Sequence, residues 1–355
     1  MRVRSLALAA AVLAGTIACG GTPDSQGAAD QTGGSVDLTG AGATFPYPLY
    51  SRWFSDYAKK TGVRINYGSL GSGAGIRQVS EETVDFGATD SPRTEKELAA
   101  AKGGELLHIP MVAGAVVVAY NLPDLTQPLR LTGELVADIF LGQVVRWDDP
   151  RIAAVNPGVQ LPARDILVVH RTDGSGTTFV FTDYLASISQ PWANGPGRGK
   201  QVSWPTGLGG KGNEGVAAQV QQMPGSIGYT EVAFAGQTGL QVADIRNQAR
   251  NFVAPTVENV QAAAEGVLDQ LPPDTDFRVS IVNAPGDSAY PIAALTWILV
   301  YQKQKDPVKG ERLMEFLRWA LTDGGDQARA LEYAPLPSRI AERVLERVDS
   351  VQMGR

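Results

Sequence analysis

From residue 37 onward, short apolar runs alternate with stretches in which apolar residues recur at helical spacing. Several of the short runs are rich in Val and Ile, as is typical of strands that are buried on both faces of a sheet. These runs predict strands over 64–67, 84–88, 115–120, 166–169, 226–229 and 297–301. The helical spacing predicts helices over 46–60, 76–82, 132–140, 177–187, 214–222, 258–270, 307–322 and 339–347.

The alternation of strands and helices indicates an α/β fold with mainly parallel sheets. At 355 residues the chain is long enough for about two domains. The long apolar segments near 115 and 295 allow two arrangements of these domains. Either the chain leaves a first domain near 115 and returns to it near 290, or two domains follow one another in series.

The first 18 residues have the layout of a secretory signal. Arg2 and Arg4 make a basic start, and the apolar run that follows is shorter than the ~20 residues needed to span a bilayer. Cys19, the one cysteine, ends the segment TIAC, which resembles a bacterial lipobox with Thr16 in place of the usual Leu. Residues 19–36 are mostly small and polar, as in a flexible tether. We therefore predict an exported protein, periplasmic or at the cell surface, with a lipid anchor on Cys19; the alternative is an ordinary cleaved signal with an incidental cysteine.

The composition excludes several classes of protein. With 43% apolar and 19% charged residues, the chain can bury a core and is not disordered throughout. One Cys allows no internal disulfide, and two His with one Cys supply neither a structural zinc site nor a His-rich catalytic metal centre, so we expect no such metal. The net charge of −6 gives no support for nucleic-acid binding.

Three glycine-rich segments, each with a hydroxyl residue, lead into predicted helices. They are GAGATFP at 40–46, GSGAG at 71–75 and DGSGT at 173–177. The first N–H groups of a helix have no partner inside the helix and lie at the positive end of its dipole, so such turns suit an anion. Any one of these turns is better explained as an ordinary helix cap, but three together favour a bound anion. The anion should be small, because Gly212 follows Gly210-Lys211 where a nucleotide-binding P-loop needs Ser or Thr.

Two charged residues lie next to these turns. Arg171 comes at the end of a predicted strand, and its guanidinium can bind a tetrahedral oxyanion through two hydrogen bonds while Asp173 holds it in orientation. Asp90 also follows a predicted strand, and a carboxylate there would accept the proton that hydrogen phosphate carries and sulfate lacks. The alternatives are a surface Arg–Asp pair and a turn-capping Asp90. His108 and His170 are interpreted as structural.

A series of segments resembles, in order, the substrate-binding protein of the bacterial ABC phosphate transporter. The segments are LTGAGATFPYPLYSRW, NYGSLGSGAGIRQ, VDFGATDSP, DIFLGQVVRWDDPRIAAVNPG, HRTDGSGTTFVFTDYL, WPTGLGGKGNEGVAAQVQQMPGSIGYTE and YPIAALTWILVYQ. The resemblance covers about residues 37–345 and implies the two-lobed, type II periplasmic-binding-protein fold. Each lobe would be a mainly parallel sheet flanked by helices, and two hinge strands would join the lobes. The implied first lobe is 37–115 with 286–348, and the implied second lobe is 116–285.

The resemblance also implies, by motif position, which residues bind phosphate. They are Ala43 (through its backbone), Thr44, Phe45, Ser72 and Asp90 in the first lobe, and Arg171, Ser175, Gly176 and Thr177 in the second, with Asp173 bracing Arg171. The implied function is high-affinity binding of inorganic phosphate between the lobes and its delivery to an ABC import permease that has a separate ATPase. The protein would be a monomer, would catalyse no reaction and would need no cofactor.

Three other functions are weighed against this one. A secreted phosphatase with Ser175 or Thr177 as nucleophile lacks a metal set and a His base, since strand alternation should turn His170 away. A binding protein for sulfate, molybdate or tungstate would leave Asp90 facing an anion without a proton. A purely adhesive surface lipoprotein would need none of these residues.

Overall fold

The computed structural model describes residues 36–272 and 275–354. The predicted signal over 1–18, Cys19 and the predicted tether up to residue 35 therefore lie outside the described residues.

The strands are β1 (Asp37–Gly42), β2 (Arg64–Ser69), β3 (Phe86–Thr89), β4 (Leu106–Tyr120), β5 (Arg130–Leu131), β6 (Leu167–Arg171), β7 (Leu208–Gly210), β8 (Ser226–Glu231), β9 (Gln241–Val242), β10 (Asp244–Arg246), β11 (Phe252–Val253), β12 (Ala293–Tyr301), β13 (Lys303–Gln304), β14 (Ala334–Pro335) and β15 (Gln352–Met353). The helices are α1 (Tyr47–Thr61), α2 (Ser72–Ser80), α3 (Glu95–Ala99), α4 (Gly133–Phe140), α5 (Pro150–Val155), α6 (Gly176–Ile188), α7 (Gln190–Asn194), α8 (Gly212–Gln222), α9 (Val232–Thr238), α10 (Val257–Leu268), α11 (Pro307–Thr322), α12 (Gly325–Ala330) and α13 (Ser338–Asp349).

The strands and helices predicted from the hydrophobic pattern are all present, with shifted ends. The largest shift is in β4, which begins at Leu106 rather than at residue 115. The pattern did not predict β1, whose sequence DLTGAG has no Val or Ile run. This strand forms because β2 and β3 pair with it in parallel on either side, and because the Phe86 ring fills the space that a side chain at Gly40 would take.

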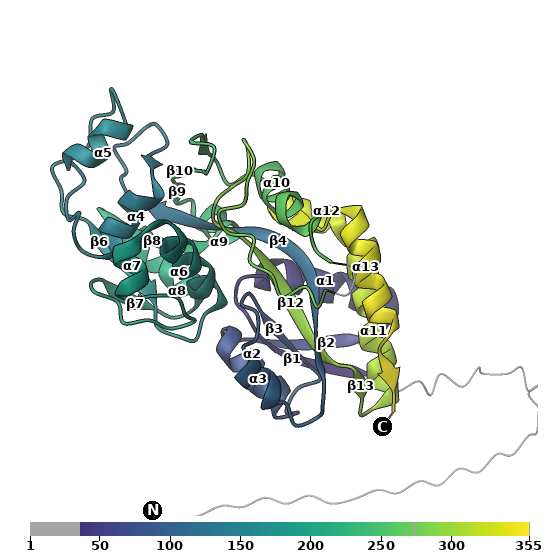
Figure 1. Cartoon of the computed structure of the whole chain (residues 1–355). Helices are drawn as coiled ribbons and strands as arrows, with labels where there is room; N and C mark the ends of the chain where they lie inside the picture. Colours follow the sequence, from purple (N-terminus) through teal and green to yellow (C-terminus); the bar gives the residue numbers. More distant parts are fainter. Residues whose placement is uncertain (1–35, 273–274, 355) are drawn as a thin grey trace, which may run out of the picture. The chain divides into compact units, whose positions relative to one another are not determined.

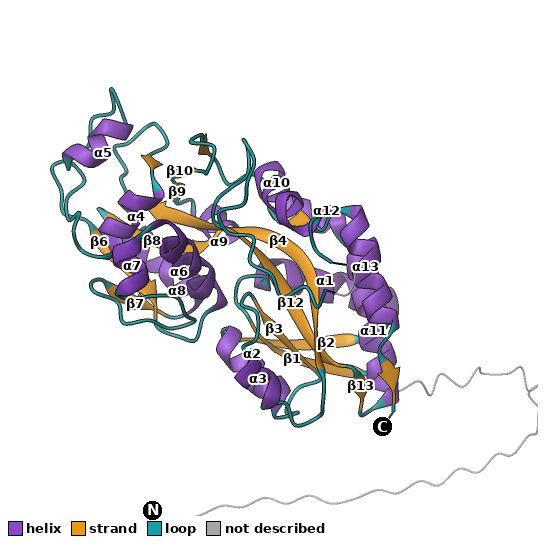
Figure 2. Ribbon diagram, viewed as in Figure 1, coloured by secondary structure: helices purple, strands orange, loops and turns teal. Residues whose placement is uncertain are grey.

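A ten-stranded sheet runs through the described chain in the main order β2-β1-β3-β12-β4-β8-β6-β7. The first part of β4, from Leu106 to Ala115, pairs with β12, whereas Val116–Tyr120 pairs with β8. We therefore call β2, β1, β3 and β12 the first section of the sheet, and β8, β6 and β7 the second section. Figures 1 and 2 show β4 as the strand that continues from one section into the other.

The strand directions are mixed within each section. The outer strands β2, β1 and β3 are parallel to one another, as are β8, β6 and β7. In contrast, β12 is antiparallel to both β3 and β4, and β4 is antiparallel to β8. The fold is α/β as the sequence predicts, with an antiparallel pair of long strands where the two sections meet.

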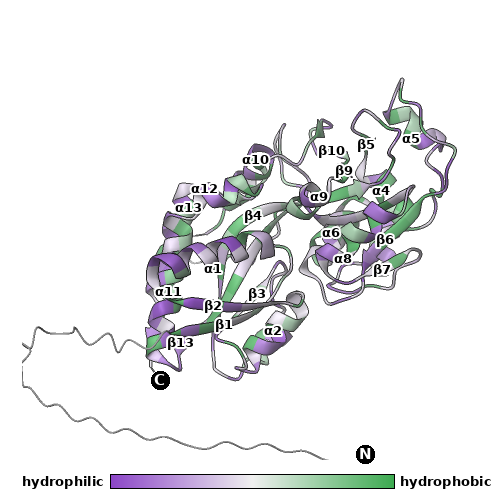
Figure 3. Cartoon of the chain, turned by 180° about the vertical axis from the view of Figure 1, so that it is seen from behind, coloured by the Kyte–Doolittle hydropathy of each residue, from purple (hydrophilic) through white to green (hydrophobic). Residues whose placement is uncertain are grey.

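The core is built around these long strands. Every residue of β4 and of β12 is buried, and Figure 3 shows β4 largely in the apolar colour. Helix α1 packs on the first section through the apolar stripe expected from its sequence, and its buried residues are Leu49, Tyr50, Trp53, Phe54 and Tyr57. Helices α6 and α8 pack against the second section. Among the described helices, none has both the length and the apolar character needed to cross a bilayer.

Candidate functional site

The three glycine-hydroxyl segments all lie at the carboxyl ends of strands or the amino ends of helices. The segment at 40–46 connects β1 to α1, the segment at 71–75 begins α2, and the segment at 173–177 connects β6 to α6. In α/β sheets, ligands bind at the carboxyl ends of the strands, where helix N-termini also meet. The fold therefore supplies the setting that the sequence predicts for an anion.

The first section contributes buried hydroxyl and carboxyl groups. Asp90 directly follows β3 and is 2% exposed, and Ser72 at the start of α2 is fully buried. The Asp90 backbone N–H donates to Ser72 Oγ at 3.2 Å, and Ser72 Oγ donates to Asp90 Oδ2 at 3.4 Å. Thr296 of β12 donates to Asp90 Oδ1 at 2.9 Å. Three elements thus fix the position of this carboxyl group.

The turn after β1 supplies backbone donors at two of its three predicted positions. The N–H groups of Thr44 and Phe45 have no acceptor among the described residues, and both side chains are buried. Ala43 is different, because its N–H donates to the Ala88 carbonyl at 3.0 Å and its own carbonyl accepts from Tyr67. The expected backbone contact from Ala43 therefore has no free donor.

The second section contributes a buried cation. Arg171, at the end of β6, is 3% exposed, and Asp173 holds its guanidinium from one side. Arg171 Nε donates to Asp173 Oδ1 at 2.8 Å and Nη2 donates to Oδ2 at 2.5 Å. Burial alone would raise the pKa of Asp173, but the Arg171 guanidinium outweighs it and lowers the pKa below the ordinary value. The remaining Nη1 donates to Thr177 Oγ1 at 3.4 Å, so the guanidinium faces the start of α6.

The start of α6 carries free donors beside this cation. Ser175 is the N-cap of α6, and its Oγ accepts from the Thr178 N–H at 2.9 Å. Gly176 and Thr177 are the first two residues of the helix, so their N–H groups have no acceptor within it. All three residues are buried. Ser175 thus acts as the ordinary cap considered above, while the two N–H groups after it remain available.

Direct contacts join the residues of the two sections. A side chain at Gly176 would overlap Ser72 Oγ and Asp90, so the α6 N-terminus lies against the carboxyl group of the first section. The Gly73 N–H donates to the Gly174 carbonyl at 2.8 Å. Ser72 and Asp90 thereby come together with the turn at 173–177, although more than 80 residues separate them in the sequence.

Asn213 is a site residue that the sequence reasoning missed. It is fully buried at the start of α8, and its Nδ2 donates to Thr44 Oγ1 at 2.9 Å and to Thr177 Oγ1 at 3.1 Å. It therefore connects a hydroxyl of the first section to one of the second. Asn213 lies within one of the segments that carry the family resemblance, and its position between a glycine and the acidic first turn of a predicted helix was the available signal.

The electrostatics of the site centre on Asp90. Burial raises the pKa of Asp90 from 3.8 to about 7, while the hydrogen bond from Thr296 and the charge of Arg171 act in the opposite direction. A buried cation and several free N–H groups therefore surround a carboxyl group that can gain or lose its proton near neutral pH. This combination suits a small oxyanion that itself carries a proton.

Neither histidine belongs to this group of residues. His108 is buried against Trp297 and accepts from the Arg93 N–H, and burial lowers its pKa to about 3. The His170 ring stacks on Trp204, with ring centres 4.8 Å apart. The described residues contain no cluster of His, Cys, Asp or Glu side chains that could hold a metal ion.

Comparisons with known proteins identify the family and the fold. The family described as "PBP superfamily domain" matches residues 24–324. The chain is 44% identical over 308 residues to the phosphate-binding protein PstS of Pasteurella multocida, covering 86% of this chain and 88% of that protein. It is 38% identical over 354 residues to the phosphate-binding protein PstS of Methanocaldococcus jannaschii, covering 94% of this chain and 91% of that protein. These relatives are named as binding proteins, not as enzymes.

Two solved structures share the fold. The phosphate-binding protein from Stenotrophomonas maltophilia has a TM-score of 0.68 and 20% identity, over 88% of this chain and 94% of that one. The high affinity periplasmic phosphate-binding protein PfluDING, bound with phosphate, has a TM-score of 0.70 and 22% identity, over 87% of this chain and 93% of that one.

Proposed function

The chain belongs to the PBP superfamily and, within it, to the phosphate-binding protein PstS family, and we propose that it binds inorganic phosphate with high affinity for delivery to an ABC importer. The observation that carries this proposal is the pairing of buried Arg171 with buried Asp90 across the contact between the two sections. Arg171 supplies the positive charge that an anion needs. Asp90 supplies an acceptor that only a protonated anion can use.

The proposed phosphate ligands are the residues expected from the sequence except Ala43, and Asn213 is added as a residue that orients two of them. Thr44, Phe45, Gly176 and Thr177 would donate through their N–H groups, and the hydroxyls of Thr44, Ser72, Ser175 and Thr177 would complete the shell. Ala43 would hold the turn in place, because its N–H is already used. Asn213 would orient the Thr44 and Thr177 hydroxyls. Hydrogen bonds to charged groups contribute about 1.5–3 kcal/mol each, so such a shell can offset the desolvation of the ion.

Selectivity between anions would depend on whether the anion carries a proton. Hydrogen phosphate near neutral pH still carries a proton, which the Asp90 carboxylate would accept in a hydrogen bond. Sulfate carries none, so two acceptors would face each other in a buried site. The same argument disfavours molybdate and tungstate, whereas arsenate, which is protonated, should compete with phosphate.

Capture would require the two sections to separate and close. We propose that they correspond to two lobes, 37–115 with 286–348 and 116–285, because β4 changes its pairing partner between Ala115 and Val116. The ion would enter when the lobes are apart. Closing would then bring Arg171 and the α6 N-terminus against Asp90 and expel water from the ion.

Delivery would take place outside the cytoplasmic membrane. The basic and apolar start of the chain supports export, and Cys19 supports a lipid anchor at the end of the tether. The closed monomer would dock on a membrane permease driven by a separate ATPase. No step in this cycle needs a metal or a cofactor.

A calorimetric titration of the purified, phosphate-free protein tests the proposal. We expect tight binding of phosphate, competition by arsenate and little or no binding of sulfate. Arg171→Ala should weaken phosphate binding by several kcal/mol, because it leaves the ion without its cation. The absence of phosphate binding, or equal binding of sulfate, would contradict the function, and an unchanged affinity of Arg171→Ala would remove Arg171 from the site.

A further inference from the structure

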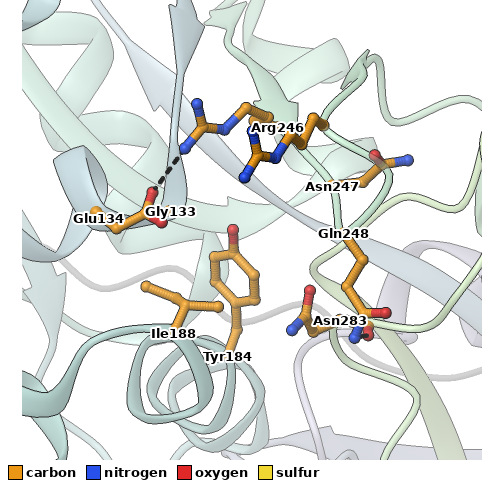
Figure 4. A pocket seen from close by; sticks show the side chains of 9 residues that line it. Gly133, Glu134, Tyr184, Ile188, Arg246, Asn247, Gln248 and Asn283 are labelled. Carbon is orange, nitrogen blue, oxygen red and sulfur yellow. Dashed lines mark hydrogen bonds and ion pairs between the residues drawn. The ribbon is translucent and has the colours of Figure 1, made fainter.

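A second group of polar side chains surrounds a cavity that contains none of the proposed phosphate ligands. The cavity has a volume of about 340 Å³. Its walls come from the start of α4, from α6, from the turn between β10 and β11, and from Asn283, as Figure 4 shows. Its volume lies within the ~300–1,000 Å³ that is usual for sites of small molecules.

Tyr184 of α6 presents a polar atom to this cavity. Its side chain is 1% exposed, yet its hydroxyl makes no hydrogen bond to any described residue. In Figure 4 the hydroxyl points toward the space between Glu134 and Arg246. Burial raises the pKa of Tyr184, so the hydroxyl keeps its proton and remains a donor. The hydroxyl is reachable from the cavity, so a molecule bound there can supply the hydrogen-bond partner that it lacks among the described residues.

Two arginines make the same cavity positive. Arg246 Nη2 lies 3.3 Å from Glu134 Oε2, and this pair is partly open to solvent. Arg250 also lines the cavity, and among the described residues no hydrogen bond or ion pair engages its guanidinium. Two cations thus face one carboxylate, in a protein whose net charge is −6. Guanidinium groups bind carboxylate and phosphoryl oxygens through paired hydrogen bonds.

The turn between β10 and β11, which follows Arg246 and carries Arg250, is fixed in place. Asn247 is buried, and its Nδ2 donates to the Asp287 carbonyl at 2.9 Å while its Oδ1 accepts from the Asn251 N–H at 3.0 Å. Gln248 Nε2 donates to the Asn283 carbonyl at 2.8 Å. These bonds tie the turn between β10 and β11 to the segment before β12. A ligand would therefore meet a backbone that is already ordered, whereas the exposed Arg250 side chain would become ordered on binding.

We propose that this cavity is a second binding site, for a small organic anion that carries a carboxylate or phosphoryl group. Arg246 and Arg250 bind the anionic group, and the Tyr184 hydroxyl donates to it. The amides of Gln248 and Asn283 line the rest of the cavity and suit hydroxyl or further carboxylate groups on the ligand. The site is separate from the proposed phosphate site, because the two share no residue, although α6 contributes to both.

The test uses calorimetry on the full mature protein saturated with phosphate, so that the proposed phosphate site is already filled. Citrate and glycerol 3-phosphate are titrated separately, with glycerol as the neutral comparison. We expect at least one anion to bind at concentrations below about 10 mM, and glycerol not to bind. Binding of citrate alone identifies a carboxylate site, and binding of glycerol 3-phosphate alone identifies a phosphate-ester site.

Four variants test whether an anion binds to these particular side chains or is only attracted non-specifically to positive charge on the protein. Arg250→Gln should weaken binding at least tenfold, and Tyr184→Phe should weaken it roughly threefold to tenfold while keeping the buried ring. Glu134→Gln should strengthen binding, because it removes the carboxylate that competes for Arg246. Arg312→Ala removes a partly exposed guanidinium on α11 and should change nothing.

The proposal is overturned if neither anion binds, or if Arg250→Gln and Tyr184→Phe bind it as tightly as the unchanged protein. Phosphate affinity is measured in parallel for each variant and should stay constant. If the unchanged protein does not bind phosphate, that result counts against the proposed function and not against this second site.

Discussion

Asp90 places a carboxyl group in a site proposed for an anion, and its surroundings explain how this can work. Thr296 and Ser72 fix its two oxygens, and burial raises its pKa to about 7. Near and above pH 7 the carboxylate form is populated, and this form accepts a hydrogen bond from a protonated ion and repels an ion that has no proton. The same residue would then favour capture and reject ions that have no proton.

Replacing Asp90 by Asn tests this role directly. Asp90→Asn keeps the size of the side chain but turns an acceptor into a group that can also donate. We expect the preference for phosphate over sulfate to fall by tenfold or more, because the amide can donate to sulfate. Competition calorimetry measures the ratio, and Asp124→Asn, at an exposed position, serves as the control. An unaltered ratio in Asp90→Asn would show that selectivity arises elsewhere.

The raised pKa of Asp90 also predicts how stability depends on pH in the absence of phosphate. The folded protein holds this proton up to about pH 7, whereas the unfolded chain releases it near the ordinary pKa of 3.8. Between these values the contribution of Asp90 to the free energy of unfolding falls as pH rises, by up to about 4 kcal/mol, and it is level above pH 7. Urea unfolding of the unchanged protein and of Asp90→Asn measures this contribution. A difference between the two proteins that stays constant from pH 4 to 8 contradicts the prediction.

The longer helices and the buried strands were the elements that the sequence predicted well, whereas the short helices α3, α5, α7, α9 and α12 were not predicted. The apolar stripe of α1 and the Val-rich run in β4 each reflect packing that one segment reveals by itself. By contrast, β1 is held by neighbours on both sides and by the Phe86 ring over Gly40, so its own residues give little signal. Short strands that depend on their partners are therefore the ones a pattern misses.

The same distinction applies to the candidate site. The Arg171–Asp173 pair is visible from its spacing of two residues, and the family motifs supply the positions of the other proposed ligands. Asn213 and Thr296 are different, because their contacts reach Thr44 and Asp90 from segments far away in the chain. A single sequence does not show which distant polar residues will meet, so these two emerged only from the structure.

At the scale of the whole molecule, an ion pair joins the two proposed lobes near the site. Lys200 Nζ lies 2.7 Å from Glu97 Oε1, with side chains 20% and 26% exposed. Burial raises the pKa of Glu97, but the hydrogen bond from Lys200 and the other interactions outweigh it and lower the pKa below the ordinary value. The Lys200 carbonyl also accepts from the Ser175 N–H at 2.9 Å. The pair is thus tied to the proposed phosphate ligands and can hold the closed form.

Removing this pair should speed the release of phosphate. We expect Lys200→Ala and Glu97→Gln each to raise the dissociation rate roughly twofold to fivefold, since a partly exposed ion pair contributes about 0.5–1 kcal/mol. The association rate should change little, because the pair forms after the ion enters. Stopped-flow fluorescence measures both rates, and the double variant should be no faster than the faster single variant. Arg312→Ala, which removes a pair within α11, is the control, and an unchanged dissociation rate in both single variants contradicts the role.

A single strand, β4, serves both sections of the sheet, and this limits how the chain can be divided. A break near residue 115 would separate β12 from both of its partners, β3 and the first part of β4, so each fragment would carry unpaired strand edges and tend to aggregate. The two halves therefore cannot be produced or exchanged as independent modules. Any movement between them must bend or twist a continuous piece of β-structure, so the stiffness of that strand, rather than the length of a linker, sets how far the halves can part.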